Sequence, residues 1–517
     1  MGEKLQLLIA MAGYMLIVIL IGIFFAKKSQ ANSENYFLGG RSLGPWVAAM
    51  SAEASDMSGW LLMGLPGVAY WCGIADAAWT AIGLAVGTYI NWLLVSKRLR
   101  SYSIVSGNSI TVPDFLSNRF HEKKKVILTI AAGFIIIFFT IYAASCFVTC
   151  GKLFSGLFGY SYHSMMIVGA AFVLIYTILG GFLAESASDF MQAVVMIIAL
   201  VGVFVCGTVK AGGINAVIEN ARAITGYLSL TAIANPVTDT NGVQQALNGS
   251  PLFGEGSEYG FLTILSTASW GLGYFGVPQV LLRFMAIRKS SELKRSRRIA
   301  TVWVVISLTA AVFIGVLGRY LLPTDAALAT QSGAENVFAH LAQLLFHPLL
   351  AGVVMAGILA ATISSSASSL LIAAKNIFGS VIKKNATDKQ IMHVSRAVLL
   401  LITVFGMVIA WDENSVIFEV VSFAWSGFGA TFGPIILFSL FWKRVNRPGA
   451  IAGMLAGGIS VFVWKLLLKP LGGIFGIYEL MPAFIVSCIF IVVVSLLTAK
   501  PSAEMEAEFE KARTYSE

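Results

Sequence analysis

The chain has 517 residues, of which 57% are hydrophobic and only 12% are charged, whereas roughly 25% of the residues of a soluble protein are charged. Its mean hydropathy is +0.81, and a soluble protein of this length would need far more polar surface. The composition therefore excludes a soluble enzyme, a disordered protein and a disulfide-stabilised secreted domain. It predicts an all-α membrane protein that crosses the bilayer many times.

Thirteen apolar stretches are long enough to cross the hydrocarbon core, which takes about 20 helical residues. The stretches cover approximately residues 5–26, 46–72, 75–96, 126–154, 162–182, 189–209, 260–287, 299–321, 349–380, 393–411, 416–442, 448–468 and 478–499. The first has no small-residue cleavage pattern, so we expect a retained helix rather than a cleaved signal peptide.

The net charge of +9 comes from basic residues that cluster between the apolar stretches. If the N-terminus lies outside, only seven of the 35 Lys and Arg residues fall outside, and the other 28 fall inside or at inner helix ends. Because basic residues are retained in cytoplasmic loops, this asymmetry predicts an external N-terminus and a cytoplasmic C-terminus. The acidic tail 503–517 is expected to be a short cytoplasmic helix or a disordered end. Glu335–Phe346 is amphipathic and predicts a short external helix.

Two of the stretches are unlike simple membrane helices. The second contains Ser51–Trp60 and then Gly64–Gly67, and the seventh contains Ser269–Pro278, so both combine small polar residues, glycines and a proline. The two stretches stand five apart, as inverted five-helix repeats require. Interrupted helices at matching positions of two halves point to a transporter binding site. The alternative is that the glycines merely permit close helix packing.

Acidic and hydroxyl side chains at membrane depth are the next candidates. Glu53 and Asp56 lie in the second stretch, where an ionised carboxylate is costly unless it is paired or hydrated. In the ninth stretch, Ala361, Ser364 and Ser365 share a helix face, and hydroxyl and carbonyl oxygens suit a small hard cation such as Na⁺. The alternatives are a helix cap at Asp56 and serines that bond back to their own helix.

An aromatic stripe follows the seventh stretch. Trp270, Tyr274 and Pro278 are spaced four residues apart, and Tyr142 lies in the fourth stretch. Such a stripe is more often packing or an interfacial belt than a binding wall. The neighbouring glycines, which leave room for a ligand, favour the binding wall here.

Several long segments resemble the sodium:solute symporter family, most closely its bacterial members that carry proline. These segments are Leu38–Pro45, Ala54–Gly67, Trp270–Gly276, Tyr176–Ala184 and the region around Ser439–Gly457. The resemblance covers essentially the whole chain, from about Asn35 to Glu504. It implies a five-plus-five inverted repeat of the leucine-transporter type with extra flanking helices. Residues 1–502 would form one transporter domain, with the first repeat at 46–209, the second at 260–442, and a cytoplasmic tail at 503–517.

The resemblance also implies roles for individual residues. Na⁺ would be held by the carbonyls of Ala54, Met57 and Ala361 and by the hydroxyls of Ser364 and Ser365, with support from Asp56. Asp189 would lie in the inner ion pathway, although Ser186 and Ser188 before it leave helix capping open as an alternative. Arg41 would act at the cytoplasmic mouth. The substrate would contact the residues Ser58, Gly59, Tyr142, Trp270, Tyr274 and Pro278.

The sequence departs from the family pattern at four positions. Ser365 stands where the nearest members often carry Thr, and Ala367 replaces a serine of a second sodium site found in some members. Glu53 and Glu419 stand where the proline carriers usually have uncharged residues.

The function that the resemblance implies is uptake of L-proline coupled to Na⁺ across the cytoplasmic membrane. The expected partners are L-proline, Na⁺ and the lipid bilayer, with no cofactor, nucleic acid or protein partner evident. The alternatives are a sodium symporter for another amino acid, a sugar acid or a vitamin, a sensor with a transporter fold, and a membrane-embedded enzyme. Neither a catalytic triad nor a metal cluster in the sequence supports an enzyme.

Overall fold

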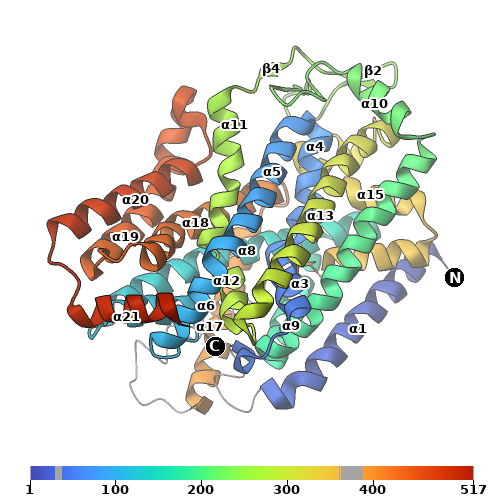
Figure 1. Cartoon of the computed structure of the whole chain (residues 1–517). Helices are drawn as coiled ribbons and strands as arrows, with labels where there is room; N and C mark the ends of the chain where they lie inside the picture. Colours follow the sequence, from blue (N-terminus) through green and yellow to red (C-terminus); the bar gives the residue numbers. More distant parts are fainter. Residues whose placement is uncertain (1, 30–37, 360, 363–387, 516–517) are drawn as a thin grey trace.

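The computed structural model describes residues 2–29, 38–359, 361–362 and 388–515 (Figure 1). Within them, eight helices are long and apolar enough to cross a membrane, and shorter apolar helices cover Trp60–Cys72, Tyr162–Ile175, Pro348–Leu359 and Arg396–Ile409. The chain is therefore a helical, multi-pass membrane protein, as its composition predicts.

The elements of the first half follow in chain order. They are α1 (Glu3–Ser29), η1 (Gly39–Arg41), α3 (Pro45–Asp56), η2 (Trp60–Gly64), α4 (Leu65–Cys72), α5 (Ile74–Ile90), η3 (Asn91–Val95), α6 (Ser96–Val105), α7 (Val112–Arg119), α8 (Val126–Phe158), α9 (Tyr162–Lys210) and α10 (Ile214–Arg222). Four two-residue strands come next, namely β1 (Ala232–Ile233), β2 (Ala246–Leu247), β3 (Ser250–Pro251) and β4 (Ser257–Glu258). Strand β1 pairs with β4 and β2 pairs with β3, both antiparallel.

The second half is again helical. Its elements are α11 (Phe261–Ala268), η4 (Ser269–Phe275), α12 (Pro278–Ala286), η5 (Ser290–Glu292), α13 (Leu293–Leu321), η6 (Ala326–Leu328), α14 (Gln331–Ala334), α15 (Val337–Leu345), α17 (Asp388–Ile409), α18 (Ile417–Phe441), α19 (Arg447–Val463), η8 (Trp464–Leu468), η9 (Lys469–Leu471), η10 (Gly473–Gly476), α20 (Leu480–Leu497) and α21 (Ala503–Thr514).

Most predicted stretches correspond closely to helices, and α8 and α18 begin within a residue of the predicted positions. The short helix expected at Glu335–Phe346 is present as α15, and the acidic tail is helical in α21. The ninth stretch begins as the apolar helix Pro348–Leu359, and its residues 363–380 lie outside the described residues.

The fifth and sixth predicted stretches correspond to the apolar spans Tyr162–Ile175 and Glu185–Lys210, which both belong to α9. The backbone between them is assigned as helix, so the two spans follow each other without the loop expected at residues 183–188. Glu185 and Asp189, at the start of the second span, bind Arg283 of α12.

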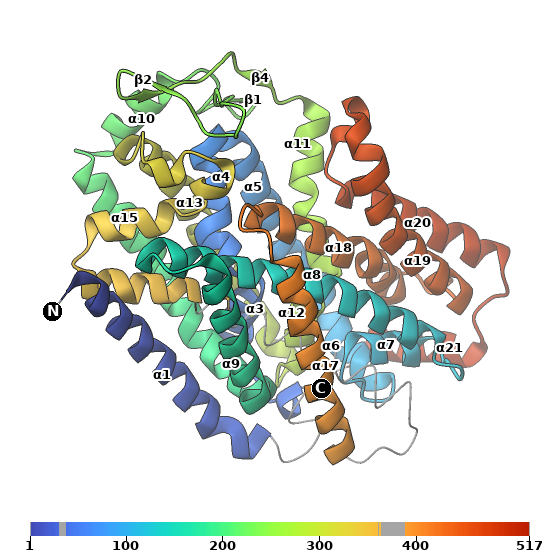
Figure 2. The same ribbon diagram turned by 180° about the vertical axis from the view of Figure 1, so that it is seen from behind.

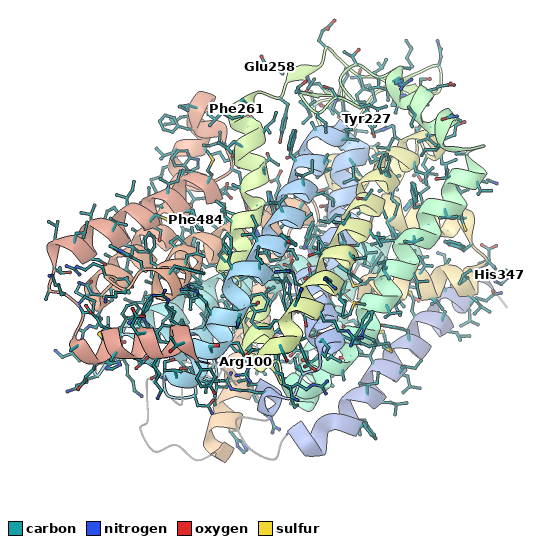
Figure 3. The ribbon with its side chains drawn as sticks, viewed as in Figure 1. Arg100, Tyr227, Glu258, Phe261, His347 and Phe484 are labelled. Atoms are coloured by element: carbon teal, nitrogen blue, oxygen red, sulfur yellow. The ribbon has the colours of Figure 1, made fainter. Side chains whose placement is uncertain are left out.

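The bundle has two distinct ends, shown in Figure 1. At the strand end, β1–β4 and α10 cover the tops of α4 and α5, and the Tyr227 hydroxyl donates to the carbonyls of Ala69 (2.7 Å) and Tyr70 (2.9 Å). The opposite end, called the basic end below, carries α6, α7 and α21. Figure 3 shows Arg100 at the basic end, and Tyr227 and Glu258 at the strand end.

Helix α3 occupies the centre of the bundle, where it contacts α9, α12 and α13. Helix α8 packs on α9, α17 and α18, and α1 runs along α9 on the outside (Figure 2). Large apolar side chains are exposed along the outer faces of α1, α13, α17 and α20, for example Phe24, Val302, Phe405 and Leu496. An exposed apolar belt of this extent fits burial in lipid.

Candidate functional site

Helix α3 ends in the middle of the molecule, as the serine- and glycine-rich second stretch predicts. It stops at Asp56, and Met57, Ser58 and Gly59 separate it from η2. The Ser58 amide donates to the Asp56 carbonyl at 3.0 Å, which closes a tight turn instead of another helical turn. A helix end leaves its last carbonyls without intrahelical partners, so this break presents carbonyl oxygens at the centre of the bundle.

The seventh stretch is broken at a similar depth. Helix α11 tightens into the 3₁₀ segment η4, the chain becomes extended at Val277, and α12 starts at Pro278. Proline fits the first turn of a helix because its missing N–H needs no partner there. A Cβ at Gly276 would overlap the Phe428 carbonyl, and one at Gly273 would overlap the Trp425 indole. The glycines therefore serve both the break and the close packing around it.

The two breaks meet at Asp56. The Tyr274 hydroxyl of η4 donates to Asp56 Oδ2 at 2.6 Å, and the Tyr142 hydroxyl of α8 donates to the Asp56 carbonyl at 2.8 Å. Asp56 Oδ1 is buried and has no hydrogen-bond partner among the described residues. A buried carboxylate oxygen without a donor favours a cation beside it, since an uncompensated buried charge is costly.

Glu53 lies one turn before Asp56 on α3 and is equally buried, at 1% exposed against 0%. The Trp92 indole N–H donates to Glu53 Oε1 at 3.4 Å, while Oε2 has no hydrogen-bond partner in the described part of the chain. Two neighbouring buried carboxylates repel each other, so a cation or a proton is needed to keep both in place.

The predicted sodium ligands are described only in part. Ala54 and Met57 flank Asp56 at the end of α3, and Ala361 is fully buried. Ser364 and Ser365 lie outside the described residues. Their role stays a prediction.

The aromatic residues of the predicted stripe are brought together with others from distant segments. The Trp270 ring lies 5.3 Å from the Tyr478 ring, 5.2 Å from Phe418 and 5.9 Å from Trp60, as measured between ring centroids. The Trp425 indole donates to the Trp270 carbonyl at 2.8 Å, and its ring meets Tyr274 edge-on. The aromatic stripe is therefore part of a central aromatic cluster, not a belt at the membrane surface.

A cavity of about 500 Å³ opens beside this cluster toward the strand end. Trp270, Phe418 and Tyr478 line it, together with the acidic residues Asp76 and Glu419. The Gln331 side chain donates to Glu419 Oε1 at 3.3 Å. Trp270, which lines the cavity, also lies against Trp60 of the first broken helix.

The remaining predicted substrate residues lie around the same breaks. Ser58 is buried in the turn after α3, and Gly59 packs so closely on Thr149 of α8 that a Cβ would lie 2.5 Å from its methyl carbon. Pro278 is the first, buried residue of α12. Contact of these three with a substrate stays a prediction.

Asp189 belongs to a buried ionic cluster that the sequence did not reveal. Arg283 of α12 binds Glu185 Oε1 at 2.7 Å and Asp189 Oδ2 at 3.0 Å, and the Ser51 hydroxyl donates to Asp189 at 2.7 Å. All of these side chains are 2% exposed or less. Helix capping by Asp189 is thus wrong, because the residue lies inside α9. Arg283 could have been recognised as a single charge within the predicted stretch 260–287.

Arg41 closes the basic end near the last turn of α12. Its guanidinium donates to the carbonyls of Met285 (2.6 Å) and Ser109 (2.8 Å) and to the side chain of Asn108 (3.1 Å). Leu43, two residues later, forms a parallel bridge with Ile287. These contacts join the segment before α3 to the end of α12. A role for Arg41 at the cytoplasmic mouth stays a prediction.

The family profile described as "Sodium:solute symporter family" matches residues 36–457. The chain belongs to the sodium:solute symporter family. It is 40% identical over 518 residues to the sodium/proline symporter of Staphylococcus aureus (strain USA300 / TCH1516), covering 98% of this chain and 96% of that protein. The same identity and coverage apply to the symporter of strain NCTC 8325 / PS 47.

Solved structures place the fold among known transporters. A Na⁺-coupled sialic acid symporter, in a substrate-bound outward-open state, has a TM-score of 0.74 at 18% identity, over 96% of this chain and 99% of that one. MhsT in complex with L-phenylalanine has a TM-score of 0.52 at 12% identity, over 87% of this chain and 97% of that one. These likenesses establish a transporter fold, and the family is one of transporters rather than enzymes.

Proposed function

We propose that this protein is a sodium-coupled symporter that carries L-proline into the cell across the cytoplasmic membrane. The observation that carries the proposal is the junction of the two broken helices at Asp56, where Tyr274 and Tyr142 converge. The near full-length likeness to a sodium/proline symporter supports the choice of solute.

Proline is a zwitterion with a small apolar ring, and the site offers a partner for each part. Half-helix amides at the breaks suit its carboxylate. The aromatic side chains of Trp270, Tyr274 and Tyr142 suit its ring and ammonium. Ser58, Gly59 and Pro278 complete the proposed substrate set.

Na⁺ is proposed to bind beside proline, on the carbonyls of Ala54, Met57 and Ala361 and the hydroxyls of Ser364 and Ser365. Asp56 supports this site through its negative charge, and Asp189 lies farther along the path that the ion takes to the cytoplasm. Ligands that are mostly neutral hold the ion weakly enough for release. Because the two sites adjoin, each ligand raises the affinity for the other.

Alternating access is proposed to work through a five-plus-five inverted repeat, with residues 46–209 as the first repeat and 260–442 as the second. The positions of the two broken helices, α3–α4 and α11–α12, support this division. The strand end faces outside and the basic end faces the cytoplasm, as the distribution of Lys and Arg predicts. Arg41 then acts as part of the cytoplasmic gate, and the cavity at Trp270 is the external entrance.

The proposed cycle moves one charge when one Na⁺ enters with one zwitterion. A membrane potential of about 100 mV supplies roughly 2.3 kcal/mol for this charge, and a tenfold Na⁺ gradient adds about 1.4 kcal/mol. Together they permit roughly 500-fold accumulation of proline at a 1:1 stoichiometry.

The proposal is tested by uptake of radiolabelled L-proline into proteoliposomes under an imposed inward Na⁺ gradient, with K⁺ and H⁺ gradients as controls. Uptake that requires Na⁺ and is inhibited only by proline-like competitors is the expected result. Na⁺-dependent uptake of another solute in place of proline would contradict proline as the substrate and leave Na⁺ as the coupling ion. Uptake driven by H⁺ alone would contradict the sodium site and make Glu53 and Asp56 candidate proton carriers.

A further inference from the structure

A second cavity, of about 860 Å³, lies at the basic end between η3–α6 and the start of α13. Five basic side chains line it, and they come from three different segments of the chain: Lys97, Arg288, Lys289, Lys294 and Arg297. The cavity shares no lining residue with the cavity at the strand end, and its lining residue Trp92 contacts Glu53 of α3 and Phe284 of α12.

The positive charge of this cavity is poorly compensated within the described part of the chain. Glu292 neutralises Arg288, with its carboxylate at 2.7–3.0 Å from the guanidinium. Lys97, Lys289, Lys294 and Arg297 form no ion pair with a described carboxylate. The Arg297 guanidinium lies 5.2 Å from the Tyr89 ring, and its buried Nε has no hydrogen-bond partner among the described residues. Like charges held this close repel each other, so the cavity favours an anion.

The side of the cavity toward the bilayer is apolar. Leu93, which lines the cavity, is 45% exposed, and Leu94 and Tyr89 beside it are 46% and 44% exposed. On the neighbouring helix α13, Val302 is 59% exposed. Helices α5 and α13 pack side by side (Figure 1), so these residues form a lipid-facing surface that runs into the cavity.

We propose that this cavity binds the phosphate headgroup of an anionic phospholipid, with the acyl chains lying on the surface between α5 and α13. Guanidinium and ammonium groups form charge-assisted hydrogen bonds with phosphate oxygens, and basic pockets between membrane helices on the cytoplasmic side are suited to anionic headgroups. The apolar surface beside the charges favours a lipid over a free anion.

The bound lipid also supports the closed cytoplasmic end. Arg288 follows Ile287, which pairs with Leu43, and its amide donates to the Leu43 carbonyl at 3.0 Å. Arg100 of α6 donates to the Ile287 carbonyl at 2.8 Å. A headgroup held by Lys97 on α6 and by Arg297 on α13 therefore links α6 to α13 beside the paired residues Leu43 and Ile287.

The test measures hydrogen exchange of residues 288–298 in the full chain, in nanodiscs of phosphatidylcholine with increasing fractions of phosphatidylglycerol. Phosphatidylglycerol should slow exchange in this segment. In the double variant Lys97→Gln with Arg297→Gln, the fraction needed for half-maximal protection should rise about 25-fold, because each basic residue near an anionic surface contributes roughly fivefold in affinity. The double variant Lys123→Gln with Lys124→Gln removes the same charge from an exposed loop of the basic end and should behave like the wild type.

Two further measurements identify the ligand and check that the variants remain folded. Inorganic phosphate added to pure phosphatidylcholine nanodiscs should give no protection, and protection there would show a free-anion site and overturn the lipid assignment. Arg297→Lys keeps the charge and should keep most of the protection, which separates a lost ligand from a lost fold. Equal protection by phosphatidylglycerol in the wild type and in the Lys97→Gln, Arg297→Gln variant would refute the proposal.

Discussion

Asp56 joins the two halves of the site through a single side chain and a single carbonyl. Its Oδ2 accepts from Tyr274, 218 positions later in the sequence, while no described residue donates to Oδ1. The sequence identified both residues as candidates, Asp56 from its charge at membrane depth and Tyr274 from the aromatic spacing. Their hydrogen bond could not be predicted, because nothing in a single sequence encodes a pairing across so many residues.

Tyr274→Phe keeps the aromatic ring and removes only the hydroxyl that holds Asp56. A lost hydrogen bond to a charged group costs about 1.5–3 kcal/mol, so the Na⁺ concentration for half-maximal proline uptake should rise at least about tenfold. Tyr162→Phe is the matched control, since it removes a buried hydroxyl that donates to Ala410 at 2.7 Å, away from the breaks. An unchanged Na⁺ dependence in Tyr274→Phe would separate Asp56 from sodium binding.

Trp270→Ala should weaken proline binding more than Na⁺ binding. The substitution removes the ring that lines the external cavity and packs on Tyr478, Phe418 and Trp60. Aromatic contacts add about 0.5–1.5 kcal/mol beyond the area they bury, so the proline concentration for half-maximal uptake should rise about tenfold or more. Trp270→Phe should restore part of the affinity. A larger effect on Na⁺ than on proline would contradict a solute-facing role.

At the scale of elements, the two helix breaks depend on glycines, because bulky side chains pack directly against their backbone. Gly273→Ala places a methyl group on the Trp425 indole, whereas a Cβ added at Gly133 on α8 would have no atom within 4 Å. Overpacking of this kind costs about 1–3 kcal/mol. Gly273→Ala should therefore lower the unfolding temperature and reduce uptake, and Gly133→Ala should change neither. Equal behaviour of the two variants in thermal unfolding would contradict the close packing at η4.

The buried ionic cluster of α9 and α12 predicts an order of stability loss among three variants. Arg283→Gln leaves Glu185 and Asp189 without their shared cation, and breaking a buried ion pair this way costs about 3–5 kcal/mol. Glu185→Gln should be milder, because Arg283 still binds Asp189 at 3.0 Å. Arg513→Gln, which breaks an exposed pair with Glu510, should have an effect below about 1 kcal/mol. Thermal unfolding of the three purified variants checks this order, and a milder loss from Arg283→Gln than from Glu185→Gln would refute it.

The sequence predicted the features that neighbouring residues determine, and it missed the features that depend on contacts between residues far apart in the chain. Glycine, serine and proline at Ser51–Gly67 and Ser269–Pro278 indicated both broken helices, because these residues weaken a helix wherever it packs. The ion pairs of Glu185 and Asp189 with Arg283 were missed, since these partners lie more than 90 positions apart in the sequence. Arg283 itself was overlooked because the sequence does not reveal which residues would pair with a single charge in an apolar stretch.

At the scale of the whole molecule, the two ends differ in a way that suits alternating access. A cavity at the strand end reaches Trp270, while at the basic end Arg41 and the Leu43–Ile287 bridge fasten the start of α3 to the end of α12. The described part of the chain is therefore open toward the proposed outside and joined on the proposed cytoplasmic side. Exchange of these two arrangements around Asp56 would carry proline and Na⁺ across the membrane.

The central claim is that Na⁺ and proline share one site at the junction of the broken helices. Calorimetric titration of the purified protein with L-proline, in Na⁺ and in K⁺ at equal ionic strength, tests it most directly. Coupled sites typically differ by about 5–150-fold in affinity, so Na⁺ should tighten proline binding within this range, and Asp56→Asn should abolish the difference. Equal proline affinity in Na⁺ and K⁺, or coupling that survives in Asp56→Asn, would contradict the account.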